Sequence, residues 1–371
     1  MFSFNPVFKL SLRTYGRIHP IRSISTSGKQ HPKYAFAFDI DGVLIRGKRA
    51  IPQAKKALQL LNGENPQNRN IPFVLLTNGG GMTEAEKAEQ ISNLVDIKIN
   101  PDQVILSHSP MRTLTEQYQD KRVLIVGGKE DVCAKVAKGY GFKKVVTPND
   151  IHAWKNSVWP YSKKSSYLTE AAQLDFSKTP IEAVMVFHDS YDWGRDIQVI
   201  LDAVCCQDGI IGTVKPDFST QTMPLYFSNN DLIWSNDFTA ARLGQGAFKQ
   251  ATEKLYSAVT EGSVLTSTSF GKPHAATYTY AEKIILDQFR KLYQLDHPTI
   301  PKQKVYAVGD NPHADVKGAN GYGWRSILVK TGVFRGEGNS KEYPADVVCD
   351  HVLDAVQWAI RQEEENESAV H

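Results

Sequence analysis

Apolar positions along the chain gather in short runs, and most of these runs end in glycine and polar side chains. A short apolar run that is closed by a turn is typical of a buried parallel strand. In the outer parts of the chain such runs lie at residues 36–38, 71–76, 104–107 and 304–309. Helical patterns alternate with them; one begins after the N-cap residue Thr83 and another covers residues 277–289. The pattern therefore predicts an α/β fold built on a parallel sheet.

A long central stretch interrupts this predicted sheet. About 190 residues separate Thr77 from Lys272, far more than a single crossover connection needs. The stretch has its own apolar runs and helical patterns, at residues 122–127, 184–188, 197–204, 224–228 and 240–258. Alternating strands and helices indicate a second α/β unit. We therefore expect a discontinuous core domain, residues 34–109 and 266–358, and an inserted domain, residues 110–265.

At 371 residues the chain is long enough to form two domains. No apolar run reaches the roughly 18–20 residues that cross a bilayer, so we expect no membrane span. The four cysteines, at positions 133, 205, 206 and 349, show no metal-binding spacing. Free thiols in a reducing compartment are the expectation that follows.

The N-terminal segment differs from the rest of the chain. No Asp or Glu precedes Asp39, whereas Lys9, Arg13 and Arg17 fall four residues apart on one helical face. Such a basic, acid-free, serine-containing segment with apolar residues is typical of a mitochondrial transit peptide. We therefore expect residues 1–30 to direct the protein to the mitochondrial matrix. A disordered basic tail is the alternative.

The formal net charge of +3 depends on this segment. Removal of residues 1–23 would delete four basic residues and change the charge from +3 to −1. A nearly neutral protein has no field suited to nucleic acid, so we expect no nucleic-acid partner. At the other end, the glutamate-rich residues 359–371 are predicted to form a solvated acidic tail.

Two carboxylates follow the first predicted strand. Asp39 and Asp41 stand two residues apart, and strand periodicity would put both side chains on one side. The carboxyl edge of an open α/β sheet is where ligands bind. Two carboxylates in one crevice raise each other's pKa unless a cation neutralises them. The pair therefore indicates a metal and chemistry, with a solvated turn rich in Asp and Gly as the alternative.

Three more segments place polar residues at the end of a strand or the start of a helix. They are Thr77-Asn78-Gly79-Gly80-Gly81, Gly271-Lys272-Pro273, and Gly309-Asp310 with Asp315 five residues later. Each segment alone is explained by ordinary turn chemistry or by a solvated charge. Their order along the chain favours one shared site.

This set of segments resembles the motifs of the haloacid dehalogenase (HAD) superfamily of phosphohydrolases, which are DxD, then Thr or Ser, then Lys, then GDxxxxD. Residues 74–78, 270–274 and 309–334 further resemble the NagD-like branch, which contains pyridoxal-phosphate and phosphoglycolate phosphatases, and within it a mitochondrial group. The resemblance covers residues from about 34 to 358. It implies a HAD Rossmann-like core with a parallel sheet and a large inserted α/β cap domain.

The resemblance also implies catalytic roles. Asp39 would attack phosphorus and form an aspartyl-phosphate. Asp41 would protonate the leaving oxygen and then activate water. Lys272 would neutralise charge on the nucleophile and on the phosphate. An acid at the position of Asp41 favours hydrolysis, because many relatives that are not phosphatases lack it.

Binding roles follow in the same way. Thr77, with the backbone N–H groups of Asn78 and Gly79, would hold the phosphoryl oxygens. Mg²⁺ would be bound by Asp39, Asp310 and the backbone carbonyl of Asp41, while Asp315 would orient that shell from behind or through water. These metal ligands would be Asp39, Asp41, Asp310 and Asp315. Relatives often continue Thr-Asn with Asn or Ser, so the three glycines of this chain predict a looser phosphate loop.

Cap residues at predicted strand ends would select the substrate. They are His188, Asp189, Asn229, Asn230 and Asp231. Ordinary polar turns are the alternative for these positions. The resemblance leaves the oligomeric state open, with a homo-oligomer formed through the cap as one arrangement.

The sequence thus predicts a Mg²⁺-dependent phosphohydrolase that acts on a small phosphorylated metabolite in mitochondria. A binding or scaffold protein that retains the fold without turnover is one alternative. A phosphotransferase is the other, because access of water to the aspartyl-phosphate decides between the two reactions.

Overall fold

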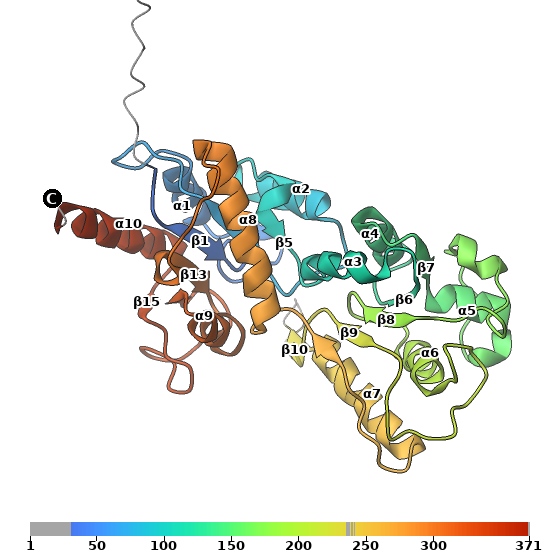
Figure 1. Ribbon diagram of the computed structural model, residues 1–371. Helices are drawn as coiled ribbons and strands as arrows, with labels where there is room; N and C mark the ends of the chain where they lie inside the picture. The colour runs from blue at the N-terminus through green and yellow to red at the C-terminus, as the bar shows by residue number, and fades with distance from the viewer. Residues whose placement is uncertain (1–30, 235–237, 239, 241, 370–371) are drawn as a thin grey trace, which may run out of the picture. The chain divides into compact units, whose positions relative to one another are not determined.

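A six-stranded parallel sheet forms the first part of the computed structural model, which describes residues 31–234, 238, 240 and 242–369 (Figure 1). Its strands are β1 (Ala35–Phe38), β4 (Phe73–Leu76), β5 (Val104–Ile105), β13 (Val305–Gly309), β14 (Arg325–Val329) and β15 (Val347–Cys349). They are ordered β15-β14-β13-β1-β4-β5. In this register, Ala37 of the central strand lies between Ala307 of β13 and Val74 of β4.

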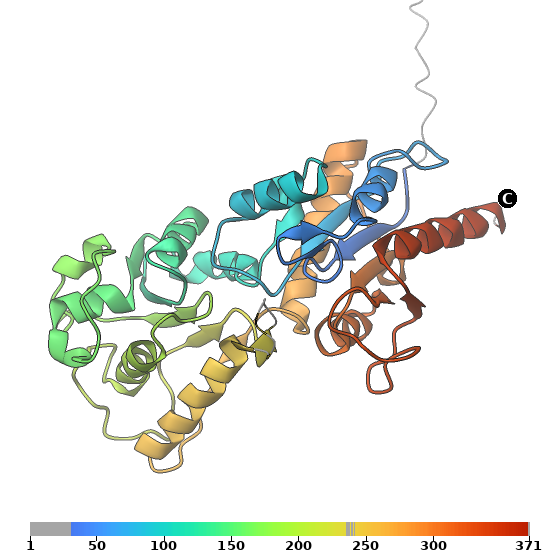
Figure 2. The same ribbon diagram turned by 180° about the vertical axis from the view of Figure 1, so that it is seen from behind.

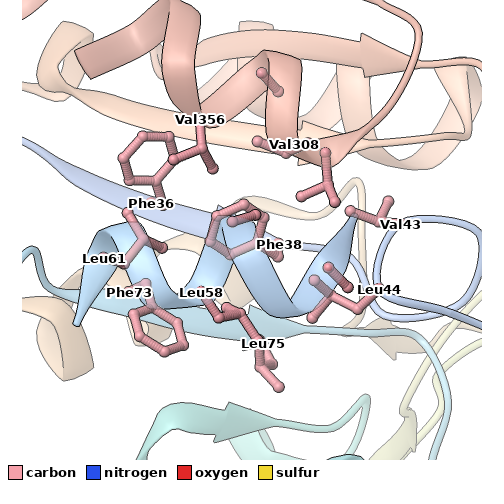
Figure 3. Packing of buried hydrophobic residues seen from close by; sticks show 14 of the residues in the cluster. Phe36, Phe38, Val43, Leu44, Leu58, Leu61, Phe73, Leu75, Val308 and Val356 are labelled. Atoms are coloured by element: carbon pink, nitrogen blue, oxygen red, sulfur yellow. The ribbon is translucent and has the colours of Figure 1, made fainter. Parts of the chain in front are cut away.

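Helices cover both faces of this sheet (Figures 1 and 2). They are α1 (Ala54–Leu61), α2 (Glu84–Val95), α8 (Ala275–Tyr293), α9 (Lys317–Tyr322) and α10 (Val352–Ala369). Phe36 and Phe38 of β1 pack into a buried cluster with α1, α2 and α10, part of which Figure 3 shows. Ala35 and Ala37 alternate to the other face, toward α8 and α9. A strand buried on both faces explains the continuous apolar run in the sequence.

A second parallel sheet, of five strands, holds the central part of the chain. Its strands are β6 (Arg122–Val126), β7 (Lys144–Val146), β8 (Ala183–Val186), β9 (Leu225–Phe227) and β12 (Thr268–Ser269), in the order β12-β9-β8-β6-β7. Its helices are α3 (Thr115–Tyr118), α4 (Val132–Tyr140), α5 (Pro148–Trp154), α6 (Trp193–Cys205) and α7 (Gln245–Val259). One buried cluster of this sheet includes α6 and α7, and another includes α4.

Two short antiparallel hairpins extend from the sheets. One pairs β2 (Ile45–Arg46) with β3 (Arg49–Ala50), and the other pairs β10 (Ile233–Trp234) with β11 (Arg242–Leu243). The second hairpin corrects the predicted helix over residues 240–258, because α7 begins only at Gln245.

The predicted fold class is confirmed: a Rossmann-like core with a parallel sheet accompanies a second α/β unit formed by the inserted residues. The domain boundaries at residues 110 and 265 stay predictions. Strand β12 pairs with β9 of the second sheet. This pairing suggests moving the second boundary from residue 265 to about 269. The predicted transit peptide, residues 1–30, lies outside the described residues.

The prediction of a solvated acidic tail was wrong for Glu363. Residues up to 369 continue α10, and Glu363 is buried. Its carboxylate accepts hydrogen bonds from the Lys304 ammonium at 2.6 Å and from the Tyr306 hydroxyl. Lys304 directly precedes β13 and Tyr306 lies within it, so this glutamate connects α10 to the central sheet. Among the described residues, no helix combines the length and apolar character that crossing a membrane requires.

Candidate active site

Three neighbouring strands end where the sequence places its candidate residues. Strands β13, β1 and β4 are adjacent in the sheet, so the residues that follow them, Asp310, Asp39 and Thr77, lie at one edge. Asp310 and Thr77 are buried, and the Asp39 side chain is 11% exposed. The sheet thus gathers polar side chains from distant parts of the sequence at the edge where open α/β sheets bind ligands.

Lys272 reaches this edge from the segment between β12 and α8. Its ammonium donates hydrogen bonds to Asp39 Oδ1 at 2.5 Å and to Asp315 Oδ1 at 2.6 Å. The Lys272 side chain is only 4% exposed. Burial lowers the pKa of Lys272, but Asp315 and Asp39 outweigh burial and raise that pKa above its ordinary value. Lys272 is therefore a fixed positive charge at the site.

Both oxygens of Asp315 are engaged. Oδ1 accepts the hydrogen bond from Lys272, and Oδ2 accepts from the backbone N–H groups of Asp310 at 3.1 Å and Asn311 at 3.0 Å. A Cβ at Gly309 would lie 2.2 Å from the Asp315 Cβ, so this close approach requires glycine. Asp315 thereby links Lys272 to the loop that carries Asp310.

Asp310 is enclosed by two glycines and a backbone donor. Its Oδ2 accepts a hydrogen bond from the Val333 N–H at 2.5 Å. A Cβ at Gly42 would lie 2.4 Å from this oxygen, and one at Gly332 would lie 1.7 Å from it. Gly42 also has a φ of +91°, which side-chain-bearing residues rarely adopt. The glycine after the DxD pair is thus needed for both its conformation and its small size.

The carboxylates carry more negative charge than Lys272 can balance. Burial raises the pKa of Asp39 well above its ordinary range; Lys272 lowers it, and the charges of Asp315 and Asp310 raise it further. Burial and Asp315 raise the pKa of Asp310 from 3.8 to about 7. With all three carboxylates ionised, one ammonium leaves two negative charges in excess. The arrangement therefore favours a bound cation.

A metal would find suitable ligands here. Carboxylate oxygens of Asp39, Asp310 and Asp315 lie within 4.8 Å of one another. Such hard oxygen donors suit a divalent cation such as Mg²⁺ or Ca²⁺. Because Asp315 already accepts hydrogen bonds on both oxygens, Asp39 and Asp310 are the better direct ligands.

Asp41 differs from Asp39 in exposure. β1 ends at Phe38, and Asp41 is exposed where Asp39 is largely buried. The Gly42 N–H donates to the Ile45 carbonyl at 2.7 Å, which turns the chain into the β2–β3 hairpin. Regular strand structure therefore ends before Asp41, and the common side expected for the two aspartates stays a prediction. The metal and acid–base roles of Asp41 stay predictions.

Asn78 has a contact that sequence reasoning missed. Its Oδ1 accepts the backbone N–H of Lys272 at 2.7 Å, and its Nδ2 donates to the Lys272 carbonyl at 3.0 Å. Next to it, Thr77 Oγ1 accepts the Gly79 N–H at 3.0 Å. The Asn78 side chain therefore positions the lysine segment, while the phosphate-binding role predicted for Thr77, Asn78 and Gly79 stays a prediction.

The glycine loop packs against a histidine of the second sheet. A Cβ at Gly81, where φ is +74°, would lie 2.3 Å from His188 Cδ2, and one at Gly80 would lie 3.3 Å from His188 Nδ1. His188 Nδ1 is 3.8 Å from Asp189 Oδ2. The glycines thus allow close approach of His188, which gives them a packing reason, while the looser phosphate loop stays a prediction.

The other predicted cap residues contact the segments of Asn78 and Lys272. Asn229 Nδ2 donates to the Asn78 carbonyl at 3.3 Å, and Asp231 Oδ1 accepts from Asn78 Nδ2 at 3.1 Å. Asn230 Nδ2 lies 2.7 Å from His274 Nε2. The structure therefore brings Asn229, Asn230 and Asp231 to the candidate site, and their role in substrate selection stays a prediction.

Tyr278 is a further residue that the sequence did not single out. Its hydroxyl donates to the backbone carbonyls of Asp315 at 3.3 Å and Ala314 at 3.4 Å. A Cβ at Gly318 would lie 2.2 Å from this hydroxyl oxygen. Tyr278 thus supports the Asp315 turn from α8. Its place in a helical pattern carried no signal for this contact.

Two models of known protein families match this chain. Residues 36–143 match a model described as haloacid dehalogenase-like hydrolase, and residues 269–355 match a second HAD hydrolase-like model. The two matches include every candidate residue at the edge of the first sheet.

Two curated relatives are each 39% identical to this chain. A mitochondrial hydrolase of Saccharomyces cerevisiae aligns over 344 residues, which cover 87% of this chain and 94% of the relative. A cardiolipin synthase (CMP-forming)/mitochondrial hydrolase fusion protein of Schizosaccharomyces pombe aligns over 356 residues. That alignment covers 95% of this chain but only 57% of the fusion protein.

Solved structures share the fold at low sequence identity. A p-nitrophenyl phosphatase from Archaeoglobus fulgidus has a TM-score of 0.59 and 14% identity, with 88% of this chain and 100% of that chain covered. NagD from Escherichia coli has a TM-score of 0.55 and 16% identity, with 88% and 98% covered. With relatives at 39% identity over most of its length, the chain belongs to the haloacid dehalogenase-like hydrolases.

Proposed function

We propose that the protein is a Mg²⁺-dependent phosphatase of the mitochondrial matrix that hydrolyses a small phosphorylated metabolite. One observation carries the proposal: Asp39 lies beside Lys272 at the carboxyl edge of the sheet, within a group of carboxylates that favours a cation. Phosphoryl transfer depends mainly on positioning and charge neutralisation. The phosphatase named among the similar structures supports this assignment.

The reaction would proceed in two displacements. An oxygen of Asp39 attacks phosphorus, the bond from phosphorus to the leaving oxygen breaks, and Asp41 donates a proton to that oxygen. Asp41 then takes a proton from water, whose oxygen attacks phosphorus and displaces Asp39. Inorganic phosphate leaves, and both aspartates return to their starting states. The exposure of Asp41 gives it access to substrate and water.

The remaining residues would hold the charges in place. Lys272 and the N–H groups that follow Thr77 would contact the phosphoryl oxygens. Asp39 and Asp310, with the carbonyl of Asp41, would hold Mg²⁺. When bound, the ion supplies positive charge that reduces repulsion between the carboxylates and the phosphate. The raised pKa values of Asp39 and Asp310 support this donor set, because they reflect burial and the charge of neighbouring carboxylates, both of which a bound cation would offset.

The inserted unit, from residue 110 to about 269, would act as the cap. His188, Asp189, Asn229, Asn230 and Asp231 would then select the substrate, since they lie at the ends of β8 and β9 and several contact the Asn78 segment. A mitochondrial location is supported by the names of both curated relatives. The basic composition of residues 1–30 supports the same location.

The test is a screen of phosphorylated metabolites with purified protein and Mg²⁺, with phosphate release as the measurement. We expect hydrolysis of at least one compound, which EDTA abolishes. Asp39→Asn should abolish phosphate release, because the nucleophile is gone. Asp41→Asn should retain Mg²⁺ affinity, since its backbone carbonyl is the proposed ligand, and should lower kcat by about 10²–10⁴-fold.

Binding of beryllium fluoride with Mg²⁺ gives a second measurement. Wild-type protein should bind it as a mimic of the phosphoryl group on Asp39, and Asp39→Asn should not. If both proteins bound Mg²⁺ and the fluoride complex alike, and neither hydrolysed any phosphoester, a binding or scaffold protein would be the better description.

A further inference from the structure

A cavity beside the β2–β3 hairpin lies outside the candidate active site. It has a volume of about 280 Å³ and is lined by Arg46, Arg49, Ile51, Gln53 and Thr331 among others. This volume is close to the lower end for pockets that bind small molecules, roughly 300 Å³. None of the residues proposed for catalysis, phosphate binding or metal binding lines it.

Neither arginine of the cavity forms an ion pair with an acidic residue that the structure describes. Within the part of the chain that the structure describes, no carboxylate forms an ion pair with Arg46 or Arg49. The nearby lysines of α1 differ, since Lys55 pairs with Asp96 at 2.6 Å and Lys56 pairs with Glu64 at 3.0 Å. The first turn of α1, which borders the cavity, also has no acidic residue. The cavity therefore has two positive charges that the protein does not neutralise.

Hydrogen bonds fix one of these arginines against the wall of the cavity. Arg46 Nη2 donates to the carbonyl of Thr331, which occupies one of the five N–H donors of its guanidinium. The Thr331 hydroxyl donates to the carbonyl of Gly42. Arg46 is thus anchored on one side, and its other donors remain for a ligand.

We propose that this cavity binds a small oxyanion, namely a phosphate group that is either inorganic or part of a small organic molecule. A guanidinium presents parallel N–H donors that match two oxygens of a phosphate, and Arg46 and Arg49 supply two such groups. Gln53 adds a neutral polar side chain, and Ile51 adds apolar surface for an attached organic part. This second anion site is separate from the one proposed at Asp39 and does not depend on the proposed activity.

The test uses the full chain in EDTA, with binding of inorganic phosphate measured by isothermal titration calorimetry. Without metal, the excess negative charge around Asp39 repels anions, so saturable binding reports the arginine cavity. We expect one site per chain. Arg49→Gln should weaken the Kd at least tenfold, because it removes a guanidinium whose charged N–H groups would donate to the oxyanion. Sulfate, which is not a phosphatase product, should compete.

Lys48→Gln is the matched control, because Lys48 is exposed in the same hairpin but does not line the cavity. It removes the same charge and should change the Kd by less than twofold. An equal loss for Lys48→Gln and Arg49→Gln would indicate diffuse surface charge and overturn the proposal, as would absence of saturable binding. Thermal unfolding checks that each variant is folded, and Arg46→Gln gives a second test at the other arginine.

Glycerol 3-phosphate in the same titration distinguishes the two sources of the phosphate group. Tighter binding than inorganic phosphate, lost in Arg49→Gln, would assign the cavity to an organic phosphate. Equal affinity for the two would assign it to the inorganic ion.

Discussion

Three carboxylates, those of Asp39, Asp310 and Asp315, lie near one ammonium group, that of Lys272. This excess of negative charge determines which of them are protonated and which can bind a cation. Lys272 donates to Asp39 and Asp315, whereas the Asp310 carboxylate accepts a hydrogen bond from the Val333 N–H. Burial and Asp315 accordingly raise the pKa of Asp310 to about 7. Each carboxylate must therefore take up a proton or share a cation. Metal binding and proton release at this site should be linked.

The first prediction concerns the stability of the metal-free protein. Asp310 binds a proton more tightly in the folded state, with a pKa of about 7, than in the unfolded state, where it is near 3.8. Its contribution to the free energy of unfolding is thus fully present below pH 3.8 and is lost as the pH rises toward 7. In EDTA, thermal unfolding should show a Tm that falls over this range. Added Mg²⁺ should raise the Tm more above pH 7 than below it.

Asp310→Asn supplies the control for this prediction. The variant has no titrating group at position 310, so its Tm in EDTA should vary less with pH than that of the wild type. It should also gain less from Mg²⁺. The same pH slope in variant and wild type would show that Asp310 is not the group responsible.

At the scale of elements, glycines in the loops set how closely neighbouring segments approach. Gly81 combines a φ of +74° with the His188 ring, whose Cδ2 would lie 2.3 Å from an added Cβ. Gly47 has a φ of +59° and nothing within 4 Å of an added Cβ. An alanine at Gly47 would therefore meet backbone strain alone, whereas an alanine at Gly81 would meet backbone strain and also overlap a side chain.

The second prediction compares alanine at these positions. Gly47→Ala should lower the free energy of unfolding by about 1–2 kcal/mol, the cost of left-handed backbone for a residue with a Cβ. Gly81→Ala should cost about 1–3 kcal/mol more, because the methyl group also overlaps His188. Urea unfolding measures both. Adding His188→Ala to Gly81→Ala should restore only the part of the free energy of unfolding that is lost through overlap with His188. Equal losses for Gly47→Ala and Gly81→Ala would rule out the proposed contact.

The third prediction concerns α10, where Glu363 binds Lys304 and Tyr306. Glu363→Ala leaves both partners without their acceptor, so the free energy of unfolding should fall by about 1–3 kcal/mol. Glu365 is exposed on the same helix, and Glu365→Ala should stay within about 0.5 kcal/mol of wild type. Urea unfolding of the two variants is the measurement. Similar values for both would mean that Glu363 is solvated, as its sequence context indicated.

The elements also show which features the sequence could predict. Apolar runs identify strands, and polar residues just after β1, β4 and β13 identify a site because parallel strands end at one edge. The side-chain contacts of Asn78 and Glu363 were missed because their partners are distant in sequence: Lys272 is 194 residues from Asn78, and Tyr306 is 57 residues from Glu363. A glutamate-rich segment indicates solvation until such a partner is known.

At the scale of the whole molecule, the charge of the chain depends on its N-terminal segment. The net charge is +3 with residues 1–23 and −1 without them. A presequence in this segment stays a prediction from its basic, acid-free composition, which is typical of segments that direct mitochondrial import.

The fourth prediction tests that segment directly. Residues 1–30 fused to a fluorescent reporter should carry it into mitochondria. Arg13→Glu with Arg17→Glu should leave the reporter in the cytosol, because their spacing in the sequence predicts that both arginines belong to the basic helical face. Lys29→Glu is the control, since Lys29 lies beyond the apolar and basic residues that form that face, and its reporter should still be imported. A reporter that stays cytosolic with the intact segment would refute the presequence. The net charge of +3 would then be that of the working protein, and its proposed matrix location would have to be abandoned.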